Sequence, residues 1–173
     1  EAAVAITAAS VENAELNVAG DNVVDLSNVD ATDYTVDGDG SLKVTDLAEE
    51  LNKFDASGMT GDLDLAVNTD NAAKNATIAG GEGTEDTVRL SNANTVQYAM
   101  SDVENVRLEN DNGELTFAAS NASDIQSITA TEGNDASFSS LGNVDMELKL
   151  IDGTAGGITT LDNAGTTTVN VED

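Results

Sequence analysis

The sequence contains no cysteine, histidine, proline or tryptophan in 173 residues. Without cysteine the chain can form neither disulfides nor thiolate metal sites, and without histidine it lacks the usual general base and zinc ligand. The commonest arrangements for acid–base and nucleophilic catalysis are therefore excluded. Carboxylate pairs of the kind that glycosidases use are inevitable among 33 acidic residues and carry little weight. We expect that the protein is not an enzyme and has no catalytic or cofactor-binding residue.

Positive charge is also scarce. The sequence has six Lys and Arg residues and 33 Asp and Glu residues, which gives a formal charge of −27. Such a field repels nucleic acid and anionic membranes and attracts cations. No apolar run approaches the roughly 18 residues of a membrane span. The chain opens at Glu1 without a methionine, which we interpret as a mature exported protein or a piece of a longer one. Together with the Asp-, Thr- and Asn-rich composition, this predicts an extracellular or cell-surface location on a bacterium.

A spaced set of apolar residues recurs along the chain. From Leu51, apolar residues follow at offsets of 3, 5, 12 and 14, with a Ser-Gly turn pair between the two groups. The second group alternates strictly, as expected for a strand with one buried face. Similar spacings start at Val11, Ala31, Val103 and, one residue shorter in the second group, at Ile125. The starts at Val11, Ala31 and Leu51 are 20 residues apart.

A period this short has room for two or three strands and none for a long helix. It predicts an all-β fold, a parallel β-solenoid (β-helix) with coils of about 20–22 residues, each adding one rung of about 4.8 Å. An antiparallel β-sandwich is the alternative, since its strands also alternate and come at regular intervals.

We predict one β-domain over residues 1–173. Residues 1–10 form an N-terminal strand or cap, residues 11–150 form the coils, and residues 151–173 hold a C-terminal edge strand at Thr166–Val171. Ser91–Met100 is extra to the repeat and is predicted as an insertion near 91–100, with Tyr98 as its candidate contact residue.

The stretch Thr35–Leu47 is similar to a calcium loop of the EF-hand or dockerin kind. Asp37, Asp39 and Asp46 would fall at ligand positions of a 12-residue loop, whereas Thr35 occupies the first position, where an acid is usual. The alternative is a polar turn at Asp37–Gly40 between two strands, and the repeat favours that turn.

The stretch GGEGTEDTV (Gly80–Val88) resembles the nonapeptide GGxGxDxUx of secreted repeats-in-toxin proteins, with one residue too many before Asp86. Thr131–Phe138 is a second, poorer copy. With the repeats at Phe54–Leu65, Val103–Leu108 and Ser123–Asp135, the chain is similar to the β-helical part of bacterial surface-layer proteins exported by the type I route. The resemblance covers roughly Val11 to Leu150. It implies a right-handed β-helix, calcium dependence and assembly into a lattice or fibre.

Divalent cations, calcium above all, are the predicted ligands of these turns, because several oxygens can hold a divalent ion where sodium only screens charge. The candidate metal ligands are Asp37, Asp39, Asp46, Glu82, Glu85, Asp86, Asn134 and Asp135.

The function predicted from these patterns is a structural, self-assembling subunit of a surface layer or filament, stabilised by calcium. Its partners would be other copies of the chain and divalent cations, with no nucleic acid and no membrane span. The alternative is an adhesin or ligand-binding module of a larger secreted protein, with Ser91–Met100 as the binding loop.

Overall fold

The computed structural model describes residues 2–48, 50–70, 72–73, 75–92, 95–109, 115–119, 121–131, 136–139, 146–151 and 165–172. Every regular element in these ranges is a β-strand. In this part of the chain no helix is long and apolar enough to cross a membrane.

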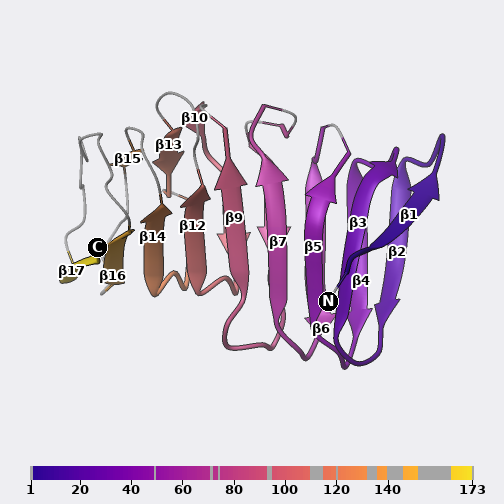
Figure 1. Ribbon diagram of the computed structural model, residues 1–173, viewed down its shortest axis with the longest axis horizontal. Helices are drawn as coiled ribbons and strands as arrows, with labels where there is room; N and C mark the ends of the chain where they lie inside the picture. Colours follow the sequence, from indigo (N-terminus) through magenta and orange to yellow (C-terminus); the bar gives the residue numbers. More distant parts are fainter. Residues whose placement is uncertain are drawn as a thin grey trace.

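The longest wall of the molecule is a nine-stranded parallel sheet that takes one strand from each coil (Figure 1). In spatial order its strands are β1 (Val4–Ala8), β3 (Asn22–Val29), β5 (Leu42–Leu47), β7 (Leu63–Asn68), β9 (Thr87–Ser91), β12 (Asn105–Glu109), β14 (Ser127–Thr131), β16 (Met146–Ile151) and β17 (Thr167–Glu172).

Two shorter parallel sheets complete the coils. A five-stranded sheet contains, in spatial order, β11 (Ala99–Ser101), β8 (Thr77–Ala79), β6 (Lys53–Met59), β4 (Asp33–Gly38) and β2 (Asn13–Val18). A three-stranded sheet contains β10 (Thr95–Val96), β13 (Leu115–Ala118) and β15 (Ala136–Ser139). In Figure 1 the coils follow one another along the long axis, from the N-terminal coils at one end to the C-terminal coils at the other.

The fold is therefore a parallel β-solenoid, as the repeat predicted, and the antiparallel sandwich is excluded because all three sheets are parallel. One inward row of the nine-stranded sheet shows the period directly. Its members follow one another at intervals of 18 to 23 residues: Val24, Val44, Leu65, Val88, Val106 and Ile128.

The structure corrects the alignment of the repeats across the middle of the chain. The sequence pattern matched Val106 with Phe54, but Val106 stacks between Val88 and Ile128 in the nine-stranded sheet. Phe54 stacks instead on Tyr34 and Ile78 in the five-stranded sheet. Every wall of a solenoid has the same alternation of buried and exposed residues, so identical offsets fit either wall.

The structure also corrects the insertion predicted near 91–100. The described residues of Ser91–Met100 include β10 and part of β11, which pair with β13 and β8 in the walls of the solenoid. Val96, Tyr98 and Met100 are buried. The segment is therefore part of a coil, and Tyr98 is a core residue, with no exposed surface to make a contact.

The core is a stack of apolar side chains along the axis of the solenoid. Tyr34 and Phe54, one coil apart, stack with ring centroids 5.6 Å apart. The Tyr34 hydroxyl donates a hydrogen bond to the Val29 carbonyl, while the buried Tyr98 hydroxyl has no hydrogen-bond partner among the described residues. Because each coil buries the same positions, every coil contributes a layer of apolar contacts to stability.

The last residue of β4, Gly38, must be glycine for the coils to stack. Gly38 has φ +133°, and a Cβ built there would lie 1.9 Å from the Val18 carbonyl oxygen of the preceding coil. Only glycine allows both this conformation and this approach.

Candidate assembly edges and acidic turns

The N-terminal end of the solenoid has an exposed apolar layer. β1 is the edge of the nine-stranded sheet and β2 is the edge of the five-stranded sheet. Val4, in the row that continues as Val24 and Val44, is 64% exposed, the highest exposure of a large apolar side chain in the described ranges. Ala14 and Leu16 are half-buried, whereas Tyr34 and Val36, one coil further on, are buried. The side chains of this end layer occupy the positions that are buried in the internal coils. No other described residue covers them.

The opposite edge of the nine-stranded sheet is β17, which pairs with β16 through all six of its residues. An outermost strand in a parallel sheet presents half of its backbone N–H and C=O groups outward, where another strand can pair with them. Within the described residues, β1 and β17 are therefore the two edge strands of the nine-stranded sheet.

A turn of the solenoid encloses a buried carboxylate. Asp86, fully buried, accepts hydrogen bonds from the backbone N–H of Leu63 at 2.6 Å and of Gly81 at 2.9 Å. The Asp86 backbone N–H in turn donates to Glu104 Oε2 at 2.9 Å. Asp62, close by, accepts from the N–H groups of Thr84 and Glu85. These carboxylates join successive coils by satisfying turn N–H groups that would otherwise have no acceptor.

Burial and mutual repulsion both act on these acids. Burial raises the pKa of Asp86, and the neighbouring Asp62 and Asp102 carboxylates raise it further, against the two hydrogen bonds that lower it. Burial likewise raises the pKa of Glu104, helped by Asp86 and Asp102. We call Asp62, Asp86, Asp102 and Glu104 the acidic turn. Its excess negative charge would be relieved by protons or cations.

The predicted calcium ligands lie in different surroundings. Asp37 is exposed on β4, Asp39 is in the turn that follows, and Asp46 is exposed on β5. The N–H groups of Asp39 and Gly40 donate to the Val18 carbonyl of the preceding coil, so this stretch forms the polar turn, as the repeat favoured. Of the second group, Glu82 and Glu85 are exposed and Asp86 is buried. Asn134 and Asp135 lie outside the described residues.

Within the described ranges, no three acidic side chains are arranged so that they could hold a metal ion. Calcium binding therefore stays a prediction. Sequence reasoning found Asp86 but missed Asp62, Asp102 and Glu104. A usable signal was present, because Asp62, Asp86 and Glu104 are each the residue immediately before a strand of the nine-stranded sheet.

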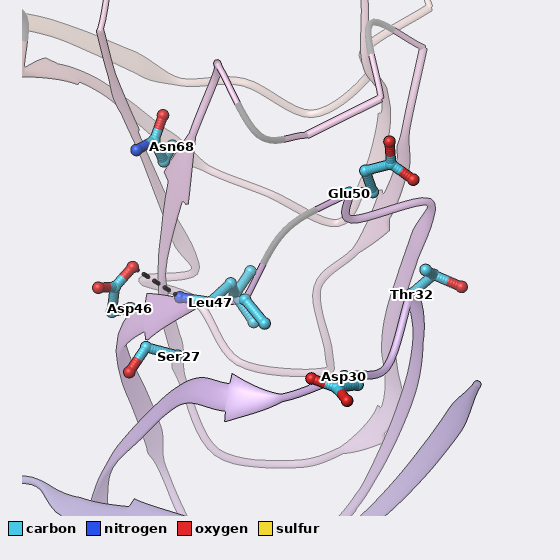
Figure 2. Close-up of a pocket in the computed structure, with 8 residues that line it drawn as sticks. Ser27, Asp30, Thr32, Asp46, Leu47, Glu50 and Asn68 are labelled. Carbon is cyan, nitrogen blue, oxygen red and sulfur yellow. Dashed lines mark hydrogen bonds between the residues drawn. The ribbon is translucent and has the colours of Figure 1, made fainter. Parts of the chain in front are cut away.

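A polar pocket of about 610 Å³ lies at a corner between successive coils. Figure 2 shows Asp46 and Ser27 on one side, Thr32 and Glu50 on the other, and Leu47 between them. One Asp46 oxygen accepts a hydrogen bond from the Leu47 N–H. The polar side chains that line this pocket suit a cation or a hydroxyl-rich molecule. Of the predicted metal ligands, Asp46 is the one that lines the pocket.

A comparison of the chain with protein families, with curated proteins and with solved structures finds no match.

Proposed function

We propose that the protein is a structural subunit that assembles with copies of itself through the ends of its solenoid. The observation that carries this proposal is the exposed apolar layer at β1 and β2, with Val4 at 64% exposure. Copies stacked end to end would cover this layer and pair the strand edges, which extends the internal contacts of the solenoid.

We propose further that calcium stabilises the assembly and that the protein lies at the cell surface. A compact body of charge −27 repels its copies, and divalent ions held by carboxylates reduce that repulsion more than sodium does. Within the acidic turn, Asp86 and Glu104 have raised pKa values, so a reduction of the negative charge around them would favour their ionised forms. The resemblance to repeats-in-toxin and surface-layer proteins supports secretion to a bacterial surface as a layer or filament subunit.

The adhesin alternative depended on Ser91–Met100 as a binding loop. Because Val96, Tyr98 and Met100 of that segment are buried, we do not propose it.

The test is a matched pair of substitutions in β1. Val4→Asp places a carboxylate in the exposed apolar layer, where stacking of a second copy would bury it unpaired. Thr7→Asp adds the same charge to the same strand at an exposed position outside the Val4 row. Sedimentation velocity should show that Val4→Asp shifts the protein from polymer to monomer while Thr7→Asp polymerises like the unsubstituted chain. Equal polymer in both variants would exclude this end as the contact.

A further inference from the structure

One row of apolar residues crosses the nine-stranded sheet from one edge strand to the other. The row begins at Val4 on β1, and every strand of the sheet adds one residue to it. The sheet register carries it past Ile128 to Val169 on β17. Its members, in spatial order, are Val4, Val24, Val44, Leu65, Val88, Val106, Ile128, Leu148 and Val169. The two edge strands therefore hold the first and the last member of the same row.

A second apolar row has the same relation to the two edges. Val171 ends it on β17, two residues after Val169. Its preceding members are Leu90, Leu108, Ala130 and Leu150. On β1, Ile6 packs against the core two residues after Val4. If β17 lies parallel to β1 with Val169 opposite Val4, Val171 is opposite Ile6, because residues on one face of a strand are two apart.

The β1 edge lacks the features that usually prevent strand pairing. Charged side chains, proline and bulges protect many edge strands. β1 has the sequence VAITA, with no charged residue, in a chain of which 23% is charged. The register shift between β1 and β3 places the extra residue on β3, since two residues of β1 span three of β3. The one charged residue of β17, Glu172, would lie opposite the uncharged Thr7, so no like charges meet.

We infer that assembly is head-to-tail, with β17 of one copy in parallel pairing with β1 of the next and Val169 opposite Val4. A parallel contact repeats the shift of about 4.8 Å that relates each coil to the next, so the chain winds in the same direction on both sides of it. An antiparallel contact between two β1 strands would reverse that direction. Since the two edges are different, the contact is heterologous and produces an open, polar filament. The inference rests on the proposed self-assembly and names the partner strand and its register.

The absence of cysteine allows this contact to be trapped by single substitutions. Ala5 would lie opposite Asn170 with Cα atoms about 4.8 Å apart, a distance that a disulfide can span. The two positions are at opposite edges of one copy, so a disulfide between them joins two copies. Oxidised filaments that mix Ala5→Cys with Asn170→Cys should give dimers on a non-reducing gel, whereas either variant alone should stay monomeric. Dimers of one variant alone that equal those of the mixture would show an antiparallel contact and overturn the inference.

Crossed pairs of cysteines test the register. Ala3 would lie opposite Thr168, and both residues are exposed. Ala3→Cys mixed with Thr168→Cys should therefore also give dimers, and this pair keeps the hydrogen bond from Asn170 to Glu147. The crossed mixtures are Ala3→Cys with Asn170→Cys and Ala5→Cys with Thr168→Cys. Each is two residues out of register, which separates the Cα atoms by about 8 Å, too far for a disulfide.

The outcomes separate this inference from the proposed function. Circular dichroism melting establishes that each cysteine variant folds, and electron micrographs establish that it polymerises. Equal cross-linking in all four mixtures, or none in any of them while filaments form, would overturn the inference and leave end-to-end assembly standing. An unsubstituted chain that remains monomeric in every condition would overturn both.

Discussion

At the scale of single residues, the structural role of Asp86 is the clearest. One carboxylate oxygen accepts the buried N–H of Leu63, and the other accepts the part-buried N–H of Gly81 in a different coil. Asp86→Ala would leave these donors without an acceptor, at about 1–3 kcal/mol each. We expect urea unfolding to show a loss of this size. Glu85→Ala, an exposed change one residue away, should stay within about 0.5 kcal/mol. Equal losses would mean that Asp86 does not join the coils.

The acidic turn also sets a pH dependence. Because the folded-state pKa values of Asp86 and Glu104 are raised, the folded state binds more protons than the unfolded state above their ordinary values of 3.8 and 4.5. The cost of their charges is present at neutral pH and is relieved as pH falls through the raised values. The free energy of unfolding should therefore rise as pH is lowered from neutral through the raised pKa values toward the ordinary values of 3.8 and 4.5.

Glu104→Gln keeps an oxygen acceptor for the Asp86 N–H and removes one of these charges, so it should flatten the slope. A slope unchanged by Glu104→Gln would exclude the acidic turn as its source. Asp25 and Asp55 act in the opposite direction. Hydrogen bonds from Ser27 and Ser57 respectively lower their pKa values, so the stability they contribute is lost only as pH falls below about 3.8.

At the scale of the strand, β7 separates buried from exposed positions. Leu65 is fully buried, whereas its neighbour Asp64 forms ion pairs with Lys43 and Arg89 on the outer face of the sheet. Leu65→Asp would bury an unpaired carboxylate at several kcal/mol. Asp64→Asn would weaken two surface ion pairs, each about 0–1 kcal/mol. Thermal melting should show a large loss for the first and a small one for the second. Similar losses would contradict the register of β7.

The strands were predictable from the sequence wherever apolar residues alternate. The turn at Asp37–Gly40 and the strands on either side of it followed from the spacing of Tyr34, Val36, Leu42 and Val44. The wall to which a strand belongs was not predictable, since alternation is the same in all walls. The repeat therefore assigned Val106 to the wall that contains Phe54, whereas it lies in the nine-stranded sheet.

The acidic turn was only partly predictable for a related reason. The glycine-rich stretch at Gly80–Val88 identified Asp86 as a special acid, but its partners Asp62 and Glu104 come from neighbouring coils. Finding them requires the correct stacking of coils. Among 33 acids, proximity cannot be deduced from spacing alone.

At the scale of the whole molecule, the net charge of −27 opposes assembly, because every copy repels the others. A ligand that binds only the folded or assembled state stabilises it by about 2.7 kcal/mol at a hundred times its Kd. We therefore expect millimolar calcium to raise the melting temperature, and a chelator to reverse the increase. Sodium chloride of equal ionic strength is the control. If it raises the melting temperature as much, calcium acts by screening alone and the coordination proposal is wrong.

The measurement that tests self-assembly most directly is negative-stain electron microscopy of the purified chain in calcium, with sedimentation of the same sample. We expect filaments or layers in which solenoids lie end to end, and we expect Val4→Asp but not Thr7→Asp to abolish them. Dispersed monomers of the unsubstituted chain at every concentration, with and without calcium, would contradict it.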